Sequence, residues 1–214
     1  MTAVKICGIT DEIALQAAAK AGAQYAGFVF YPKSPRNIVP DKAAILVKQT
    51  ALTTVGLFVD PDDETLRRIL SDVPLKMIQL HGNEPPERVA AIKSRYNLPV
   101  MKALRVATAI DITPAATYAQ VADWLLFDAK VDGAVGGTGQ AFDWTILKNY
   151  KPARPWMLAG GLTPDNVGEA LIKLAPDAVD VSSGVESSPG IKDACKIAAF
   201  VETVRHAKHS APAT

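Results

Sequence analysis

Several side chains that can exchange protons or donate hydrogen bonds stand where short apolar runs of the sequence end. They are Cys7, His81, Asp128 and Ser182. Side chains alternate between the two faces of a strand, so each of these residues shares a face with the residue two positions earlier. If the runs are neighbouring parallel strands whose last residues point inward, these groups meet at one mouth. A thiol, an imidazole and a carboxyl group gathered there indicate acid–base chemistry.

The sequence leaves two interpretations open for each of these groups. A free cysteine is often just a small buried hydrophobe, and only a few per cent of an ordinary thiol is ionised at neutral pH. A nearby cation lowers a thiol pKa, and Lys5 is one possible source because it shares a strand face with Cys7. Asp128 fits a helix cap or a loop salt bridge as well as an acid, and His81 fits a structural role as well as a substrate contact.

Two pairs of small residues suggest an anion site. Gly160 and Gly161 follow one apolar run, and Ser183 and Gly184 follow the next. Glycine lets backbone N–H groups approach an anion closely, and a helix N-terminus adds a partial positive charge. These residues therefore predict a phosphate site, although tight turns alone also explain the glycines.

Arg36 lies in a loop that Pro32 and Pro35 stiffen. A stiff loop can hold a guanidinium ready for bidentate recognition of a carboxylate. From spacing alone, an ordinary solvated surface arginine is the simpler alternative.

The elements that must position these residues alternate regularly. Eight β-rich runs are predicted as strands: Val4–Cys7, Tyr25–Phe30, Thr54–Val59, Lys76–Leu80, Val100–Leu104, Trp124–Asp128, Trp156–Ala159 and Ala178–Ser182. Helical patterns lie between them, including Asp11–Lys20, Asp62–Ser71, Pro85–Tyr96 and Pro164–Leu174. Strands alternating with helices imply parallel pairing, and eight such units predict a single-domain α/β (β/α)8 TIM barrel. An open doubly wound sheet is disfavoured, because no G-x-G-x-x-G motif follows the first strand.

In such a barrel the loops after the strands meet on one face, and those after the seventh and eighth strands commonly bind phosphate. Two long stretches without periodicity, Tyr31–Val39 and Ala129–Gln140, are candidate lid loops. We predict that residues 1–207 form the barrel and that residues 208–214 form a flexible tail.

Composition excludes several classes of protein. The chain has 214 residues, of which 49% are hydrophobic and 21% charged, and its net charge of +1 argues against bulk-charge binding to nucleic acid or membrane. Two cysteines make no disulfide framework. The sequence opens on no targeting leader and holds no run of roughly 18 apolar residues. A cytoplasmic protein, monomeric or homodimeric, is expected.

Eight segments of the chain resemble phosphoribosylanthranilate isomerase of tryptophan biosynthesis. In order they are KICGIT, GFVFYPKSPR, VGLFVD, IQLHG, LLFDAK, GGTGQAFDW, LAGGLTPDNV and VDVSSGVESSPGIKD. The likeness spans nearly the whole chain, and the opening K-x-C-G together with the SSGVE…PG-x-KD ending makes it specific.

The resemblance implies an Amadori rearrangement of a small phosphorylated substrate, with no cofactor and no metal. It implies that Asp128 is the general acid, Cys7 the general base, and Arg36 the group that orients the anthranilate carboxylate. The backbone around Gly160, Gly161, Ser183 and Gly184 would hold the phosphate. The main alternative is another phosphosugar barrel enzyme, either the histidine-pathway isomerase or the indole-glycerol-phosphate synthase type. The histidine-pathway enzyme would be expected to have a carboxylate base where this chain has Cys7.

Overall fold

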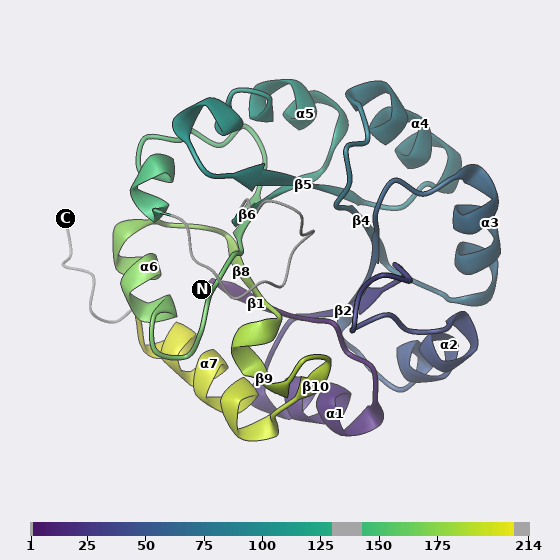
Figure 1. Ribbon diagram of the computed structural model, residues 1–214, viewed down its shortest axis with the longest axis horizontal. Helices are drawn as coiled ribbons and strands as arrows, with labels where there is room; N and C mark the ends of the chain where they lie inside the picture. The colour runs from purple at the N-terminus through teal and green to yellow at the C-terminus, as the bar shows by residue number, and fades with distance from the viewer. Residues whose placement is uncertain (1, 130–142, 208–214) are drawn as a thin grey trace.

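The computed structural model describes residues 2–129 and 143–207, and in them eight parallel strands close into a barrel that helices surround (Figure 1). The strands are β1 Ala3–Cys7, β2 Tyr25–Val29, β3 Thr53–Phe58, β4 Met77–Leu80, β5 Val100–Val106, β6 Trp124–Ala129, β7 Trp156–Leu158 and β8 Ala178–Val181. The predicted (β/α)8 barrel is therefore confirmed, and every predicted strand is present with its ends shifted by two residues at most.

Seven α-helices cover the outside of the barrel in the described part of the chain. They are α1 Glu12–Ala21, α2 Pro40–Lys48, α3 Asp63–Asp72, α4 Pro86–Tyr96, α5 Ala115–Val121, α6 Val167–Lys173 and α7 Ala194–Ala207. Short 3-10 turns occupy Ala109–Ile112 (η1), Trp144–Leu147 (η2) and Ser183–Val185 (η3), and a hairpin of β9 Glu186–Ser188 and β10 Ile191–Lys192 precedes α7. None of the helices described has the length and apolarity needed to cross a membrane.

One helix starts where its predicted range begins, and another does not. The Asp11 side chain accepts a hydrogen bond from the backbone N–H of Ala14 at 2.8 Å and caps α1. The helix predicted from Pro164 begins instead at Val167. Asn166 explains the difference, because its amide bonds the backbone of Thr163 and of Gly161 and holds the intervening residues in a turn.

The inside of the barrel changes from apolar to polar along the strands. Inward positions near the strand starts carry apolar side chains such as Met77, Leu126 and Ala178. Two residues later the same faces carry Gln79, Asp128 and Asp180, all of them buried. Strand alternation therefore delivers polar groups to the carboxyl-terminal mouth, where barrel enzymes place their active sites.

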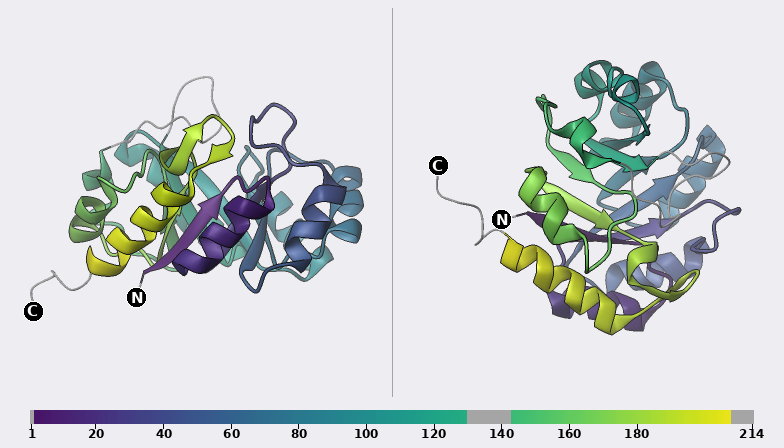
Figure 2. Two further views of the ribbon diagram at one scale, coloured as in Figure 1. Left: turned by 90° about the horizontal axis from the view of Figure 1, so that it is seen from below. Right: turned by 60° about the vertical axis from the view of Figure 1, so that its left-hand side comes forward.

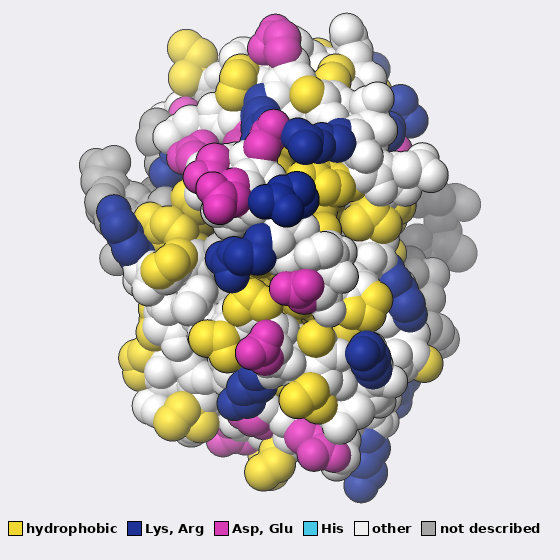
Figure 3. Space-filling model, turned by 90° about the vertical axis from the view of Figure 1, so that its right-hand side faces the viewer, with side chains coloured by type: hydrophobic (Ala, Val, Ile, Leu, Met, Phe, Trp, Pro, Cys, Tyr) yellow, Lys and Arg dark blue, Asp and Glu magenta, His cyan; other side chains and the backbone are white. Residues whose placement is uncertain are grey.

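One outer face of the barrel carries no patch of a single charge sign. On the face formed by α2, α3 and α4, acidic, basic and apolar side chains are interspersed (Figure 3). This mixture agrees with the net charge of +1.

Candidate active site

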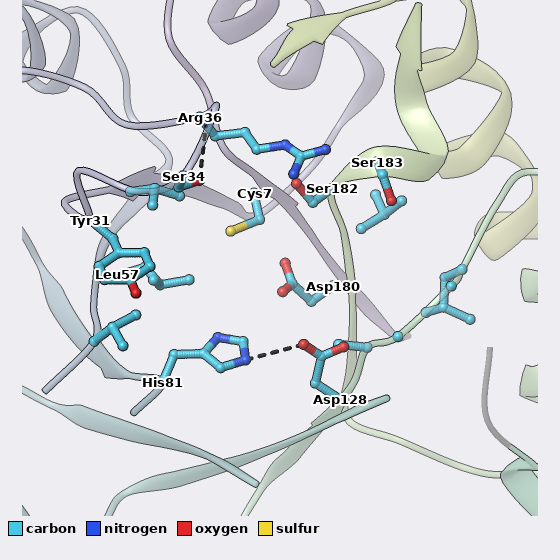
Figure 4. Close-up of a pocket in the computed structure, with 17 residues that line it drawn as sticks. Cys7, Tyr31, Ser34, Arg36, Leu57, His81, Asp128, Asp180, Ser182 and Ser183 are labelled. Atoms are coloured by element: carbon cyan, nitrogen blue, oxygen red, sulfur yellow. Dashed lines mark hydrogen bonds and ion pairs between the residues drawn. The ribbon is translucent and has the colours of Figure 1, made fainter. Parts of the chain in front are cut away.

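A pocket at the carboxyl ends of the strands gathers most of the predicted functional residues (Figure 4). Its lining includes Cys7, Arg36, His81, Asp128, Gly160, Gly161 and Ser183. The pocket, counted together with the solvent at its open mouth, holds about 690 Å³ of space.

Gly184 is the predicted site residue that does not line this pocket. A Cβ atom at Gly184 would lie 1.9 Å from the carbonyl oxygen of Leu162. The glycine is thus required where the loop after β8 packs directly on the loop after β7. It brings the two predicted phosphate loops together, and direct contact between its backbone and a phosphate stays a prediction.

Lys5 and Asp180 form a buried ion pair beside the Cys7 thiol. The parallel register of β1 and β8 sets the two residues side by side, and the Lys5 Nζ lies 2.9 Å from the Asp180 Oδ1. The Lys5 side chain is fully buried. Burial lowers the pKa of Lys5, but the charges of Asp180 and ionised Cys7 outweigh it, so the Lys5 pKa stands above its usual value.

Burial raises the pKa of the Cys7 thiol above its usual value. The charge of Lys5 acts in the predicted direction and lowers this pKa, as Lys192 does, whereas Asp180 raises it. The expectation that a nearby cation activates the thiol is therefore only half right. Lys5 is present, but its carboxylate partner and the loss of water around the sulfur outweigh it.

Asp128 is held by hydrogen bonds on the other side of the pocket. Its Oδ2 lies 3.1 Å from the His81 Nε2, and its Oδ1 accepts from the backbone N–H of Ala129 at 2.9 Å. The His81 Nδ1 in turn lies 3.2 Å from the side-chain nitrogen of Gln79. With the Gln79 amide donating, the imidazole carries its proton on Nε2 and donates to Asp128. The alternation from Gln79 on β4 to His81, which follows the strand directly, thus builds a hydrogen-bonded chain that orients the carboxyl group.

Arg36 is largely buried and does not match the solvated-surface alternative. Its side chain is 12% exposed. Its Nε donates to the Glu186 Oε1 at 3.0 Å, and its Nη2 to the Glu186 Oε2 at 2.6 Å. Bidentate recognition of a carboxylate was predicted for this side chain, and in the structure a carboxylate of the protein itself occupies one edge of the guanidinium.

The sequence interpretation missed several residues of the site. Tyr31 and Leu57 form apolar walls of the pocket, and strand-end apolar residues carry no signal that distinguishes a wall from core. Asp180 also lines it, and the strand face that it shares with the predicted mouth residue Ser182 was the signal that could have assigned it. In the described ranges no group of three or more His, Cys, Asp or Glu side chains is arranged to hold a metal ion.

The two candidate lid loops have different outcomes. In Tyr31–Val39, the backbone N–H of Ile38 bonds to Val29 at 3.0 Å, and Ser34 and Asn37 make turn hydrogen bonds. This loop is therefore folded back on β2, and a lid movement stays a prediction. The second loop, Ala129–Gln140, lies outside the described residues from position 130 onward, and so do residues 208–214.

Comparisons with known proteins agree on one family. Residues 4–203 match the family model described as N-(5'phosphoribosyl)anthranilate (PRA) isomerase. The chain is 58% identical to the N-(5'-phosphoribosyl)anthranilate isomerase of Paramagnetospirillum magneticum, covering 94% of this chain and 96% of that one. It is 53% identical to the protein of that name from Paracoccus denitrificans, with coverage of 92% and 94%.

Solved structures give the same result. The phosphoribosyl anthranilate isomerase of Thermotoga maritima superposes with a TM-score of 0.89 at 38% identity, covering 96% of this chain and 100% of that one. A phosphoribosyl anthranilate isomerase solved in complex with reduced 1-(o-carboxyphenylamino)-1-deoxyribulose 5-phosphate superposes with a TM-score of 0.86 at 37% identity and the same coverage.

Proposed function

The chain belongs to the N-(5'-phosphoribosyl)anthranilate isomerase family, and from this premise we propose which of its residues carry the reaction. It is an aldose-ketose isomerase of tryptophan biosynthesis. It converts N-(5-phospho-β-D-ribosyl)anthranilate to 1-(2-carboxyphenylamino)-1-deoxy-D-ribulose 5-phosphate. The observation that carries the assignment of roles is that Cys7, Asp128 and Arg36 line one pocket together with the small residues after β7 and β8.

The two anionic ends of the substrate have matching partners. Gly160, Gly161 and Ser183, with the backbone of Gly184, hold the phosphate. Arg36 orients the anthranilate carboxylate through the edge of its guanidinium that Glu186 leaves free. Because the anions sit at opposite ends of the substrate, anchoring both aligns the sugar between the acid and the base. This alignment is the proximity contribution to catalysis.

The reaction needs one proton delivered and one removed. Asp128 gives a proton to the furanose ring oxygen as the C1′–O bond breaks, and the nitrogen lone pair forms the C1′=N bond of a Schiff base. This cation makes the proton on C2′ acidic, and the Cys7 thiolate removes it. The C–H electrons form an enol whose tautomerisation yields the ketone. His81 and Gln79 act by orienting Asp128, and each proton transfer contributes roughly 10²–10⁴-fold to the rate.

The surroundings of Cys7 suit a strong base rather than an abundant thiolate. A raised thiol pKa means that the ionised fraction at neutral pH is small in the free protein. The thiolate that forms is correspondingly more basic, and Lys5 lies beside it to stabilise the charge. Cys7 acts as a base only, so no covalent intermediate through its sulfur is formed.

The rival phosphosugar barrels fit the chain less well. The histidine-pathway isomerase performs the same type of rearrangement and is expected to use a carboxylate base at the end of the first strand, where this chain has Cys7. The family match supports the anthranilate substrate over both rivals.

A fluorescence assay tests the proposed roles. Purified protein is mixed with phosphoribosylanthranilate, and the loss of the anthranilate fluorescence is followed. Wild type is expected to consume the substrate, and Cys7→Ser to lower kcat by roughly 10²-fold or more while KM stays near wild type. A Cys7→Ser variant with wild-type kcat would remove the thiol from the role of base.

Assembly and location stay predictions. A Thermotoga maritima relative is described as dimeric, and we expect this chain to be a monomer or a homodimer, which sedimentation measures directly. A cytoplasmic location is likewise expected.

A further inference from the structure

Two charged residues of the sequence motif SSGVESSPGIKD, Glu186 and Lys192, face each other although the proposed reaction uses neither. They stand at the two ends of the β9–β10 hairpin, and their backbones pair across it. Both side chains are buried, with 4% and 0% exposure. Burial of charged groups costs free energy unless they are paired, so this pair needs an explanation.

Glu186 is the centre of a saturated contact network. Its two oxygens accept from the Nε and Nη2 of Arg36. Its Oε1 also lies 2.8 Å from the Lys192 Nζ, and its Oε2 accepts from the backbone N–H of Gly190 at 3.2 Å. Burial raises the pKa of Glu186, but the bonds from Arg36 and Lys192 outweigh it and lower this pKa to about 2. The carboxylate is therefore charged at every pH at which the enzyme would work.

The hairpin itself packs on the loop that carries Arg36. Both project from the same end of the barrel (Figure 2). At the hairpin turn, a Cβ atom on Gly190 would lie 2.5 Å from the carbonyl oxygen of Pro35, and Gly190 has a φ of +86°. Only glycine fits this close approach without strain. The backbone next to Arg36 and the carboxylate that holds its guanidinium thus come from one rigid hairpin.

The geometry leaves a defined part of Arg36 for a ligand. Glu186 takes the edge formed by Nε and Nη2, and the N–H bonds at the far end, on Nη1 and the rest of Nη2, have no hydrogen-bond partner among residues 2–129 and 143–207. Arg36 lines the pocket, and its guanidinium lies toward Ser182 (Figure 4). We infer that Glu186 is a positioning residue, which fixes the guanidinium of Arg36 so that its free edge meets the substrate carboxylate; this rests on the proposed function.

Lys192 extends the same network to the phosphate side. Its Nζ donates to the Ser182 carbonyl oxygen at 3.0 Å and lies 3.3 Å from the Ser182 Oγ. Ser182 precedes the Ser183–Gly184 turn assigned to the phosphate. Glu186 and Lys192 therefore connect the two anion-binding ends, and the distance between the anchors is set by the hairpin.

A purely electrostatic role for Glu186 predicts the opposite result from a positioning role. A carboxylate near an anion site repels the substrate, so removing its charge would strengthen binding if only the field mattered. If Glu186 positions Arg36, removing the charge weakens the productive contact although the site becomes more positive.

The experiment compares Glu186→Gln, which keeps the shape, with Glu186→Asp, which keeps the charge but is one methylene too short for all contacts. Both are expected to lower kcat/KM by about tenfold, mainly through KM, because a misaligned guanidinium loses the carboxylate. Glu202→Gln, which removes an exposed carboxylate on α7, is the matched charge control and is expected to behave as wild type. Thermal unfolding of each variant verifies folding.

A double-mutant cycle with Arg36→Met completes the test. If Glu186 acts through Arg36, Glu186→Gln changes kcat/KM by less than about twofold in the Arg36→Met background. If Glu186→Gln does not fold, Glu186→Asp completes the same cycle. The inference is overturned if both Glu186 variants keep wild-type kcat/KM, or if Glu186→Asp alone behaves as wild type. It is also overturned if the loss in kcat/KM of the double variant equals the full sum, in free energy, of the losses of the Glu186 and Arg36 single variants. Wild-type KM in Arg36→Met would instead overturn the proposed role of Arg36, so the two failures are distinguishable.

Discussion

The two sides of the pocket hold their proton-transfer groups by different means. Around Cys7 the side chains are formal charges, with Lys5 against Asp180 and Arg36 and Lys192 against Glu186. Around Asp128 the contacts are hydrogen bonds from His81 and from a backbone N–H. The charged side joins elements from the two ends of the chain, whereas the hydrogen-bonded side lies on β4 and β6.

This difference indicates a division of labour. Charges act over distance, so the β1–β8 side sets both the protonation of the thiol and the attraction of an anionic substrate. Hydrogen bonds act by direction, so the β4–β6 side sets the orientation of the acid. Substitutions on the charged side should therefore alter the pH dependence of catalysis and KM. Substitutions on the hydrogen-bonded side should alter kcat.

The largest expected effect is loss of the acid itself. Asp128→Asn keeps the shape of the side chain but cannot donate an acidic proton, so kcat should fall by roughly 10²–10⁴-fold with KM near wild type. Steady-state fluorescence kinetics measure both constants. A loss confined to KM would place Asp128 among the binding groups and undo the division between the two sides.

The next effect concerns stability in acid. The folded-state pKa of Glu186 is depressed from 4.5 to about 2. The ionised carboxylate therefore contributes to the free energy of unfolding above about pH 4.5, and this contribution is lost as the pH falls toward 2. The contribution is at most about 3 kcal/mol of unfolding free energy. Denaturant unfolding between pH 5 and pH 2 should show a steeper loss for wild type than for Glu186→Gln. Parallel curves would mean that the network contributes no acid-labile stability.

The pH profile of catalysis sharpens the comparison further. Since Cys7 must be ionised and its pKa is raised, kcat/KM should rise with pH through the alkaline region above the ordinary thiol range. Lys5→Met removes a charge that lowers this pKa and should move the rise to higher pH. Lys102→Met is the matched control, because Lys102 is an equally buried lysine that pairs with Glu84 outside the barrel. If kcat/KM rises at a pH below the usual pKa of a thiol, the assignment of Cys7 as the base is contradicted.

The smallest effect is expected on the hydrogen-bonded side. Gln79→Met removes the amide that orients His81, and kcat should fall by about three- to tenfold with an unchanged pH profile and KM. Stability should hold, because the Gln79 Oε1 is buried and has no hydrogen-bond partner among the described residues. An unchanged kcat would show that His81 keeps its orientation without the amide.

The features predicted well from sequence are those that repeat or act locally. The β-rich runs identified every strand, and period-two alternation correctly placed Cys7, His81 and Asp128 on one mouth. The helix predicted from Asp11 begins there, with Asp11 as its cap, whereas Pro164 does not start one, because a side-chain turn at Asn166 competes with it. Local propensity cannot weigh such competition.

Two properties of the site could not be derived from sequence. The Glu186 partner of Arg36 lies 150 residues away, and no spacing rule connects them. The direction of the Cys7 pKa shift depends on burial and Asp180, which raise this pKa, against Lys5 and Lys192, which lower it. Their balance exists only once the barrel has closed.

The separations across the charged side also bear on folding kinetics. Lys5 and Asp180 are 175 residues apart, and Arg36 and Glu186 are 150 apart. Contacts that span nearly the whole chain carry the largest loop-closure cost and are expected to form late. Weakening them should therefore speed unfolding more than it slows folding. The return of substrate binding during refolding would then coincide with the pairing of the first and last strands. The rate at which enzyme activity recovers would therefore measure the rate at which the barrel closes.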